Sequence, residues 1–141
     1  MAHSFIGSYQ NNMDAKGRVI LPIVFREEIG RKFALTRGID NNLDLFPLDV
    51  WEKNVEKLNA LKNSNPNARK LKRRILGNAN IIEIDNQDRI TIPQNLREAC
   101  GLVKEIIFVG DGDRIEVWSK QIYLADDEDN DYSVIAEDVD Y

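Results

Sequence analysis

Short apolar runs separated by turn-forming residues make up the first fifty residues of the chain. Runs of three to five mainly apolar or β-branched residues predict short strands, because they are too short and too branched for helices. Pro22 is suited to opening a helix, the apolar residues after it recur at helical spacing, and Gly30 is a natural end. The predicted strands cover residues 4–10, 19–21, 33–36 and 43–46, with a turn at Asn11-Asn12 and a helix over residues 22–29.

The period of the pattern changes to three and four residues after Pro47. Apolar residues from Leu48 to Leu61 predict an amphipathic helix of about four turns. After a break at residues 63–66, a second helix is predicted up to Gly77, with a basic cluster from Arg69 to Arg74 on its polar face. Such a cluster is typical of a solvated face or an oligomer contact, and a helix facing DNA is the alternative.

The pattern of the first half then returns in the second half. One register of 71 residues relates Asp14 to Asp85, Arg18 to Arg89 and Pro22 to Pro93, and it becomes 72 between Gly38 and Gly110. This indicates an internal duplication with one insertion. Each unit is too small to bury its own core and strand edges, whereas two units can share one β structure. We expect repeat 1 at residues 5–50, linking helices at 51–77, repeat 2 at 78–123 and an acidic, disordered tail at 124–141.

Charge is distributed unevenly along the 141 residues. The net charge is −5, but residues 126–141 contain eight acids and no Lys or Arg, so residues 1–125 carry −5 + 8 = +3. The body is therefore mildly basic and the tail strongly acidic. A solvated extension is the simplest interpretation of the tail, and a segment that competes with DNA for the basic loops is the alternative.

The two D-x-x-x-R loops are the candidate site. Arg18 and Arg89 can each give two parallel donors to a phosphate or a guanine edge, and Lys16 adds a phosphate-seeking charge. The acid four residues before each Arg can orient it or cap the turn. Hairpin stapling without a DNA role is the competing interpretation. The candidate DNA-binding residues are Asp14, Lys16, Gly17, Arg18, Asp85 and Arg89.

These motifs resemble the MraZ family. The resemblance rests on two ordered loops, each followed by an apolar strand and a helix that begins P-x-x-[FL]-R-E. It implies a mainly β, α+β fold: a swapped-hairpin, AbrB-like barrel with pseudo-two-fold symmetry. It also implies ring-like homo-oligomers that bind repeated sites on double-stranded DNA upstream of the division and cell-wall gene cluster. The residues that carry it are Asp14, Lys16, Gly17, Arg18, Pro22, Phe25, Arg26, Glu27, Asp85, Arg89, Ile92, Pro93, Leu96, Arg97 and Glu98, with Gly7–Tyr9, Leu35–Gly38 and Ile115–Trp118.

One position departs from the family pattern, which has Gly before the Arg in both copies. The first loop has Gly17, whereas the second has Asp88. Asp tolerates a positive φ, but its carboxylate repels phosphates. We therefore expect the second loop to contribute less to DNA affinity. Arg26 and Arg97 beside Glu27 and Glu98 are expected to lie on a solvated helix face, with ion pairs within the helix or between subunits.

Other functional classes find little support in the sequence. Cys100 is the single cysteine and His3 the single histidine, and neither has a neighbour that suggests catalysis or a metal site. We expect no enzyme activity, no cofactor, no metal, no small-molecule substrate and no membrane span. The expected location is the cytoplasm, associated with the nucleoid. The rival function is an antitoxin-like, AbrB-type protein-binding module that uses its acidic tail.

Overall fold

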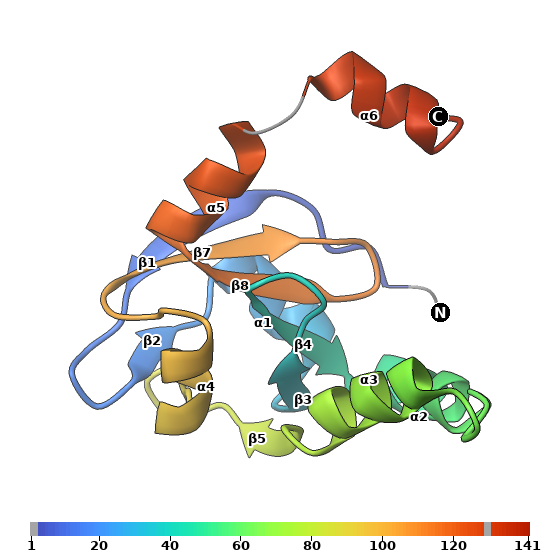
Figure 1. Ribbon diagram of the computed structural model, residues 1–141. Coiled ribbons are helices and arrows are strands. Elements are labelled where there is room, and N and C mark those ends of the chain that lie inside the picture. Colours follow the sequence, from blue (N-terminus) through green and yellow to red (C-terminus); the bar gives the residue numbers. More distant parts are fainter. Residues whose placement is uncertain (1–2, 129–130) are drawn as a thin grey trace.

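Antiparallel strands dominate the computed structural model, which describes residues 3–128 and 131–141 (Figure 1). Six of the strands form one sheet in the order β1-β7-β8-β4-β3-β5, and the other two pair with each other in a short ribbon. The strands are β1 (Ser8–Asn12), β2 (Arg18–Ile20), β3 (Lys32–Arg37), β4 (Leu43–Pro47), β5 (Asn80–Glu83), β6 (Arg89–Thr91), β7 (Glu105–Gly110) and β8 (Ile115–Ser119).

The two repeats exchange strands. The β3–β4 hairpin of the first repeat and the β7–β8 hairpin of the second meet along β4 and β8 at the centre of the sheet. Strand β1 belongs to the first repeat but pairs with β7, and β5 belongs to the second repeat but pairs with β3. The sheet therefore has the pseudo-two-fold, swapped arrangement expected for two copies that cover each other's edges.

A single core serves both repeats. Val19, Leu21 and Phe25 of the first repeat are buried in the same cluster as Ile90 and Ile92 of the second. The expected barrel is not closed by strand pairing in the described residues, because β2 and β6 pair only with each other. Each has only three residues, so the ribbon lies beside an open sheet rather than completing its circumference.

The first strand lies further along the chain than its sequence predicts. Asn11 and Asn12 were expected to form a turn, but they belong to β1 and pair with Ile106 and Glu105. The Asn11 side chain donates to the Ile20 carbonyl at 2.7 Å, so this residue connects β1 to β2. The chain reverses only afterwards, in the loop that begins at Asp14.

The described residues also form six helices (Figure 1). Prolines precede α1 and α4, as the sequence predicts, and Asn65 caps α3 by accepting from the backbone N–H groups of Asn67 and Ala68. None of the described helices is long and apolar enough to cross a bilayer. The helices are α1 (Ile23–Ile29), α2 (Leu48–Asn59), α3 (Pro66–Leu76), α4 (Gln94–Ala99), α5 (Lys120–Glu128) and α6 (Tyr132–Asp138).

The segment expected as the acidic tail contains most of α5 and all of α6. Apolar residues at helical spacing in both segments account for the helices. Helix α5 lies over β7 and β8, whereas α6 stands apart from the sheet (Figure 1). Residues 129 and 130 of the expected tail lie outside the described residues.

A buried carboxyl lies at the centre of the sheet. Asp44 on β4 is 6% exposed and pairs directly with Glu116 on β8. Asn42 Nδ2 donates to Asp44 Oδ1 at 3.0 Å, and Arg114 Nη1 lies 3.8 Å from Asp44 Oδ2. Burial raises the pKa of Asp44 to about 7, although the Arg114 charge opposes the shift. Burial also raises the pKa of Glu116.

Asp44→Asn is expected to remove a pH dependence of stability. A carboxyl with a higher pKa in the folded state holds its proton there while the unfolded chain releases one. Its contribution to stability is therefore lost as pH rises from about 4 to about 7. Between pH 5 and pH 8 the free energy of unfolding of the parent protein should fall by about 2–3 kcal/mol relative to Asp44→Asn. Urea unfolding at both pH values measures this difference, and parallel pH profiles would contradict the assignment.

Candidate nucleic-acid interface

The ribbon of β2 and β6 has one face in the core and one face outside. Val19 and Ile90 pair with each other at its centre and are both buried. Because side chains alternate along a strand, the residues on either side of this pair point outward. Arg18 and Arg89 therefore share the outer face with Ile20 and Thr91. In the register of the ribbon, Arg18 pairs with Thr91 and Ile20 pairs with Arg89, so the two arginines lie at opposite ends of the ribbon on one face.

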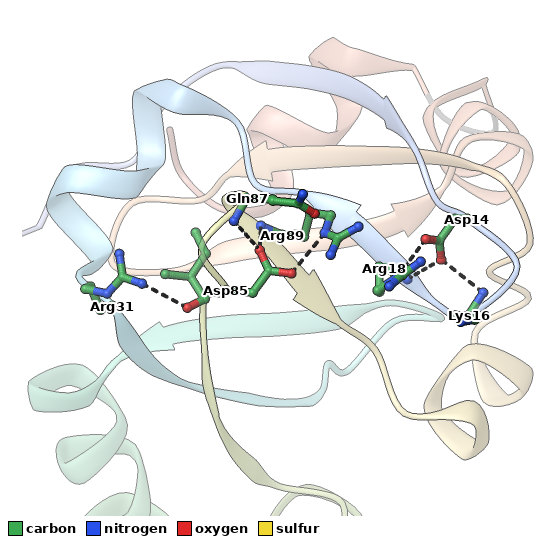
Figure 2. Close-up of polar contacts among 8 residues, drawn as sticks. Asp14, Lys16, Arg18, Arg31, Asp85, Gln87 and Arg89 are labelled. Atoms are coloured by element: carbon green, nitrogen blue, oxygen red, sulfur yellow. Dashed lines mark hydrogen bonds and ion pairs between the residues drawn. The ribbon is translucent and has the colours of Figure 1, made fainter.

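The first loop is held together by Asp14 (Figure 2). Its Oδ1 accepts from the backbone N–H groups of Lys16 at 3.0 Å and Arg18 at 2.9 Å. Its Oδ2 accepts from Arg18 Nε at 2.7 Å. Asp14 thus caps the turn and also orients the arginine, so both structural roles expected from the spacing occur together.

The second loop repeats this geometry (Figure 2). Asp85 Oδ1 accepts from the backbone N–H groups of Gln87 at 2.8 Å and Arg89 at 2.9 Å. Asp85 Oδ2 accepts from Arg89 Nε at 2.9 Å. Two segments 71 residues apart in the sequence therefore build the same Asp–Arg unit at the two ends of one ribbon.

The pKa values of both aspartates lie below the ordinary value of an aspartate. The backbone N–H of Arg18 is the main group that lowers the pKa of Asp14, and the Arg18 side chain acts in the same direction. The backbone N–H of Arg89 lowers the pKa of Asp85 in the same way. The Asp–Arg units are consequently charged at neutral pH, and each arginine keeps its orienting partner.

Each arginine also keeps its outer donors available. Among the guanidinium nitrogens of Arg18 and Arg89, only Nε has a partner in the part of the chain that the structure describes. The terminal nitrogens, Nη1 and Nη2, are left to bind an external acceptor. The side chains of Arg18 and Arg89 are 33% and 27% exposed, so the guanidinium groups are held in place but remain accessible.

The position before each arginine requires a positive φ. Gly17 has a φ of 82° and Asp88 a φ of 61°. This confirms the expectation that Asp replaces Gly at a left-handed backbone position. A side chain is excluded at Gly17 for a second reason, since an added Cβ would lie 2.8 Å from the Ile92 carbonyl oxygen and 2.7 Å from Arg97 Nε.

Each loop is hydrogen-bonded to a strand end of the opposite repeat. The Leu21 N–H donates to the Asp88 carbonyl at 2.9 Å, and the Ile92 N–H donates to the Gly17 carbonyl at 2.9 Å. Because β2 and β6 are exchanged partners, the loop of one repeat is shaped by the strand end of the other. Both Asp–Arg units therefore depend on the folding of the whole pseudo-symmetric molecule.

Arg26 and Arg97 take part in this connection and are half-buried, so the expected solvated helix face is wrong, whereas the expected ion pair forms at Arg26 with a partner in the opposite repeat. Arg26 Nε donates to the Leu21 carbonyl at 2.7 Å, and Arg97 Nε donates to the Ile92 carbonyl at 3.0 Å. Arg26 Nη1 also pairs with Asp88 Oδ2 at 3.0 Å. The arginine repeated in the two P-x-x-[FL]-R-E segments was the signal for this role. The two carbonyl partners lie five residues before each arginine, whereas Asp88 comes from the opposite loop, 62 residues away in the sequence.

The two loops differ in charge despite their shared geometry. The first contains Asp14, Lys16 and Arg18, whereas Gln87 replaces the lysine in the second. The second also contains Asp88, whose charge is offset by Arg26 across the repeat boundary. Lys16 is exposed beside Arg18, so the first loop presents the more positive surface. The structure thus brings the six sequence-predicted residues into two matched but unequal units.

Comparison with known proteins identifies the family. A family model described as "MraZ protein, putative antitoxin-like" matches residues 4–74 and again residues 75–137. The chain belongs to the MraZ family. The MraZ resemblance seen in the sequence is confirmed, and each match contains one D-x-x-x-R loop, Asp14–Arg18 in the first and Asp85–Arg89 in the second.

Curated MraZ relatives are similar over most of the chain. The "Transcriptional regulator MraZ" of Thermoanaerobacter sp. (strain X514) is 45% identical over 138 residues, which cover 96% of both chains. The protein of that name from Clostridium acetobutylicum is 43% identical over 134 residues, 94% of each chain. The one from Halothermothrix orenii is 45% identical over 117 residues, 83% of this chain and 82% of the relative.

Proposed function

We propose that the protein is a sequence-specific, DNA-binding transcriptional regulator that acts as a homo-oligomer on repeated sites in double-stranded DNA. One observation carries the proposal. Arg18 and Arg89 project from one face of a two-stranded ribbon, and each is held by an aspartate through Nε alone. The names of the curated relatives support the regulatory role.

The chemistry of the two units suits a nucleic acid. A two-stranded ribbon fits the major groove, and the Nη1 and Nη2 groups of an oriented arginine match O6 and N7 of guanine. The same donors match two oxygens of a phosphate. Lys16 is placed as a less directional phosphate contact. The aspartates act as positioning residues, because their oxygens are already used by the loop and by Arg Nε.

Repetition supplies the affinity that one chain lacks. Residues 1–125 carry only +3, and a single chain presents two arginines and one lysine, so few phosphates are neutralised. Several chains in one oligomer, ring-like by family resemblance, would bring many such units to successive DNA repeats. The second and later contacts then form at high effective concentration. We infer sites upstream of the division and cell-wall gene cluster, on the nucleoid in the cytoplasm.

Fluorescence anisotropy with labelled duplexes tests the proposal directly. The purified full chain is titrated against duplex DNA from upstream of its own gene and against a scrambled duplex of equal length and composition. We expect tighter binding to the natural duplex by about a hundredfold or more, with both affinities falling as salt rises. Equal binding to both duplexes at every salt concentration would contradict sequence-specific recognition.

Asp88→Asn is expected to strengthen DNA binding by the second loop. Asn keeps the size of the side chain and tolerates the positive φ, but it removes a carboxylate near the DNA-facing surface. It also releases Arg26 from its ion pair. We expect a gain of roughly two- to tenfold in affinity at low salt that disappears at high salt. Asp88→Gly, which restores the family pattern, should give the same gain. No gain in either variant would refute the weaker-second-loop proposal.

The protein-binding alternative is favoured by two observations. The family description contains the term "antitoxin-like", and α6 is exposed. In that case an unrelated protein would bind the tail, and the arginines of the ribbon would only stabilise their hairpins. Variants of Arg18 and Arg89 distinguish the two functions. They should impair DNA binding if the ribbon contacts DNA, and they should leave it unchanged if the arginines only stabilise their hairpins.

A further inference from the structure

Helix α6 is an amphipathic helix whose apolar side lacks a partner in the described residues. Tyr132 and Ile135 of the helix and its C-cap residue Val139 recur at helical spacing and are 84%, 47% and 66% exposed. The helix buries no side chain, and it is capped internally by Asp131, which accepts from the Ser133 N–H. A helix that exposes such a stripe is typical of a segment that binds another surface. Its charged neighbours are all acidic: Asp131, Glu137, Asp138 and Asp140.

Helix α3 has a basic surface, which is opposite in charge to the acidic residues of α6. Leu76, Gly77 and Asn63 line a groove of about 610 Å³ together with Arg69, Lys72 and Arg73. The Arg69 Nη1 group donates to the Asn63 carbonyl at 2.8 Å, which fixes one side of the groove. The aliphatic stems of the basic residues and Leu76 form an apolar floor under a positively charged rim.

The cations of α3 lack ion pairs among residues 3–128 and 131–141. The helix contains no acid that could neutralise them internally. Five like charges on one helix repel one another, so an acidic partner would lower the energy of this surface. The basic residues are Arg69, Lys70, Lys72, Arg73 and Arg74.

We propose that the groove on α3 binds helix α6 of a second copy of the chain. The apolar stripe of α6 would cover the floor around Leu76, and its acidic residues would meet the basic rim. The two surfaces match in both charge and apolar character, and every chain carries both. Such a contact is heterologous, with the tail of one copy on the linking helices of the next, so it can propagate around a ring.

The contact between α3 and α6 would hold together the oligomer of the proposed function, but it does not depend on how DNA is bound. It involves neither Arg18 nor Arg89. The arginines can therefore prove essential for DNA binding while this contact fails, and the reverse is equally possible. A cross-linking measurement separates the two questions, because its readout does not include DNA.

Disulfide trapping between two chains that each carry one introduced cysteine tests the contact. One full-length chain carries Lys72→Cys and the other, distinguished by size, carries Ile135→Cys; the native Cys100 is buried. After mixing and mild oxidation, we expect a disulfide-linked pair containing one chain of each kind. High salt should reduce the yield severalfold, because the charge attraction is screened. Ser133→Cys, on the polar face of α6, is the matched control and should give a yield at least fivefold lower.

Three outcomes would overturn the proposal. The first is no mixed pair, and the second is equal yields from Ile135→Cys and Ser133→Cys. The third is a chain carrying both Lys72→Cys and Ile135→Cys that closes only on itself, which would place the contact within one molecule. As a second measurement, Arg69→Glu/Arg73→Glu should lower the yield with the helical circular dichroism unchanged. Loss of DNA binding in that variant with undiminished cross-linking would instead assign α3 to DNA.

Discussion

The double variant Arg18→Ala/Arg89→Ala is expected to lose specific DNA binding while remaining folded. Each arginine that gives two donors to a base contributes about 1–3 kcal/mol of discrimination, or roughly 5- to 150-fold. Both are removed from every chain of an oligomer, so we expect the specific affinity to fall by more than a thousandfold. The ribbon should survive, because Val19 and Ile90 supply its buried contacts. Anisotropy titration and thermal unfolding of the same preparation measure both effects.

Two controls separate geometry from charge. Arg18→Lys/Arg89→Lys keeps the net charge but cannot give the paired donors, so it should bind as non-specifically as the alanine variant at high salt. Lys53→Ala/Lys57→Ala removes two exposed cations from α2 and should leave specific binding within about threefold of the parent. If the double alanine variant folds, oligomerises and binds its upstream DNA normally, the DNA-binding role of the loops is wrong.

Gly17→Ala is expected to destabilise the protein both by backbone strain and by a steric clash in the first loop. Alanine at the φ of 82° is strained by about 1–2 kcal/mol. Its Cβ would also lie 2.8 Å from the Ile92 carbonyl oxygen, in the backbone that fastens the loop to the other repeat. We expect a total loss of about 3 kcal/mol, which for a chain of this size lowers the melting temperature by about 6–12 °C.

Gly30→Ala is the matched control for this prediction. Gly30 has a nearly identical φ of 84°, but no atom lies within 4 Å of an added Cβ. It should therefore show only the backbone strain, a loss of about 1–2 kcal/mol and about 2–8 °C, which is smaller than the loss at Gly17. Differential scanning calorimetry compares the two variants. Equal shifts would show that contact between the repeats at Gly17 does not constrain the loop.

The repeated units could be predicted from the sequence because their signals are local. The spacing from Asp14 to Arg18 brings both ends of one turn together, and the shared register predicts the same turn at Asp85. Pro22 and Pro93 likewise precede short helices, and this signal does not depend on where the rest of the chain lies. These features depend on backbone angles and on neighbours a few residues away.

The contacts between repeats could not be predicted in the same way. The pairing of Arg26 with Asp88 spans 62 residues, and the position of Arg97 beside Gly17 exists only after β2 and β6 have paired. The Asn11-Asn12 dipeptide has turn propensity, but pairing with β7 extends the strand through it. Tertiary contacts decide each of these cases, and they depend on which strand of the other repeat lies alongside.

The number of DNA repeats provides the most direct test of the central claim that several loops of one oligomer act together. The full chain is titrated at one salt concentration against three duplexes of equal length, with one, two and three copies of the repeat from upstream of its own gene. The account predicts a steep rise, by about tenfold or more for each added repeat. Equal affinity for all three duplexes, or full affinity of a monomer for one short site, would contradict it.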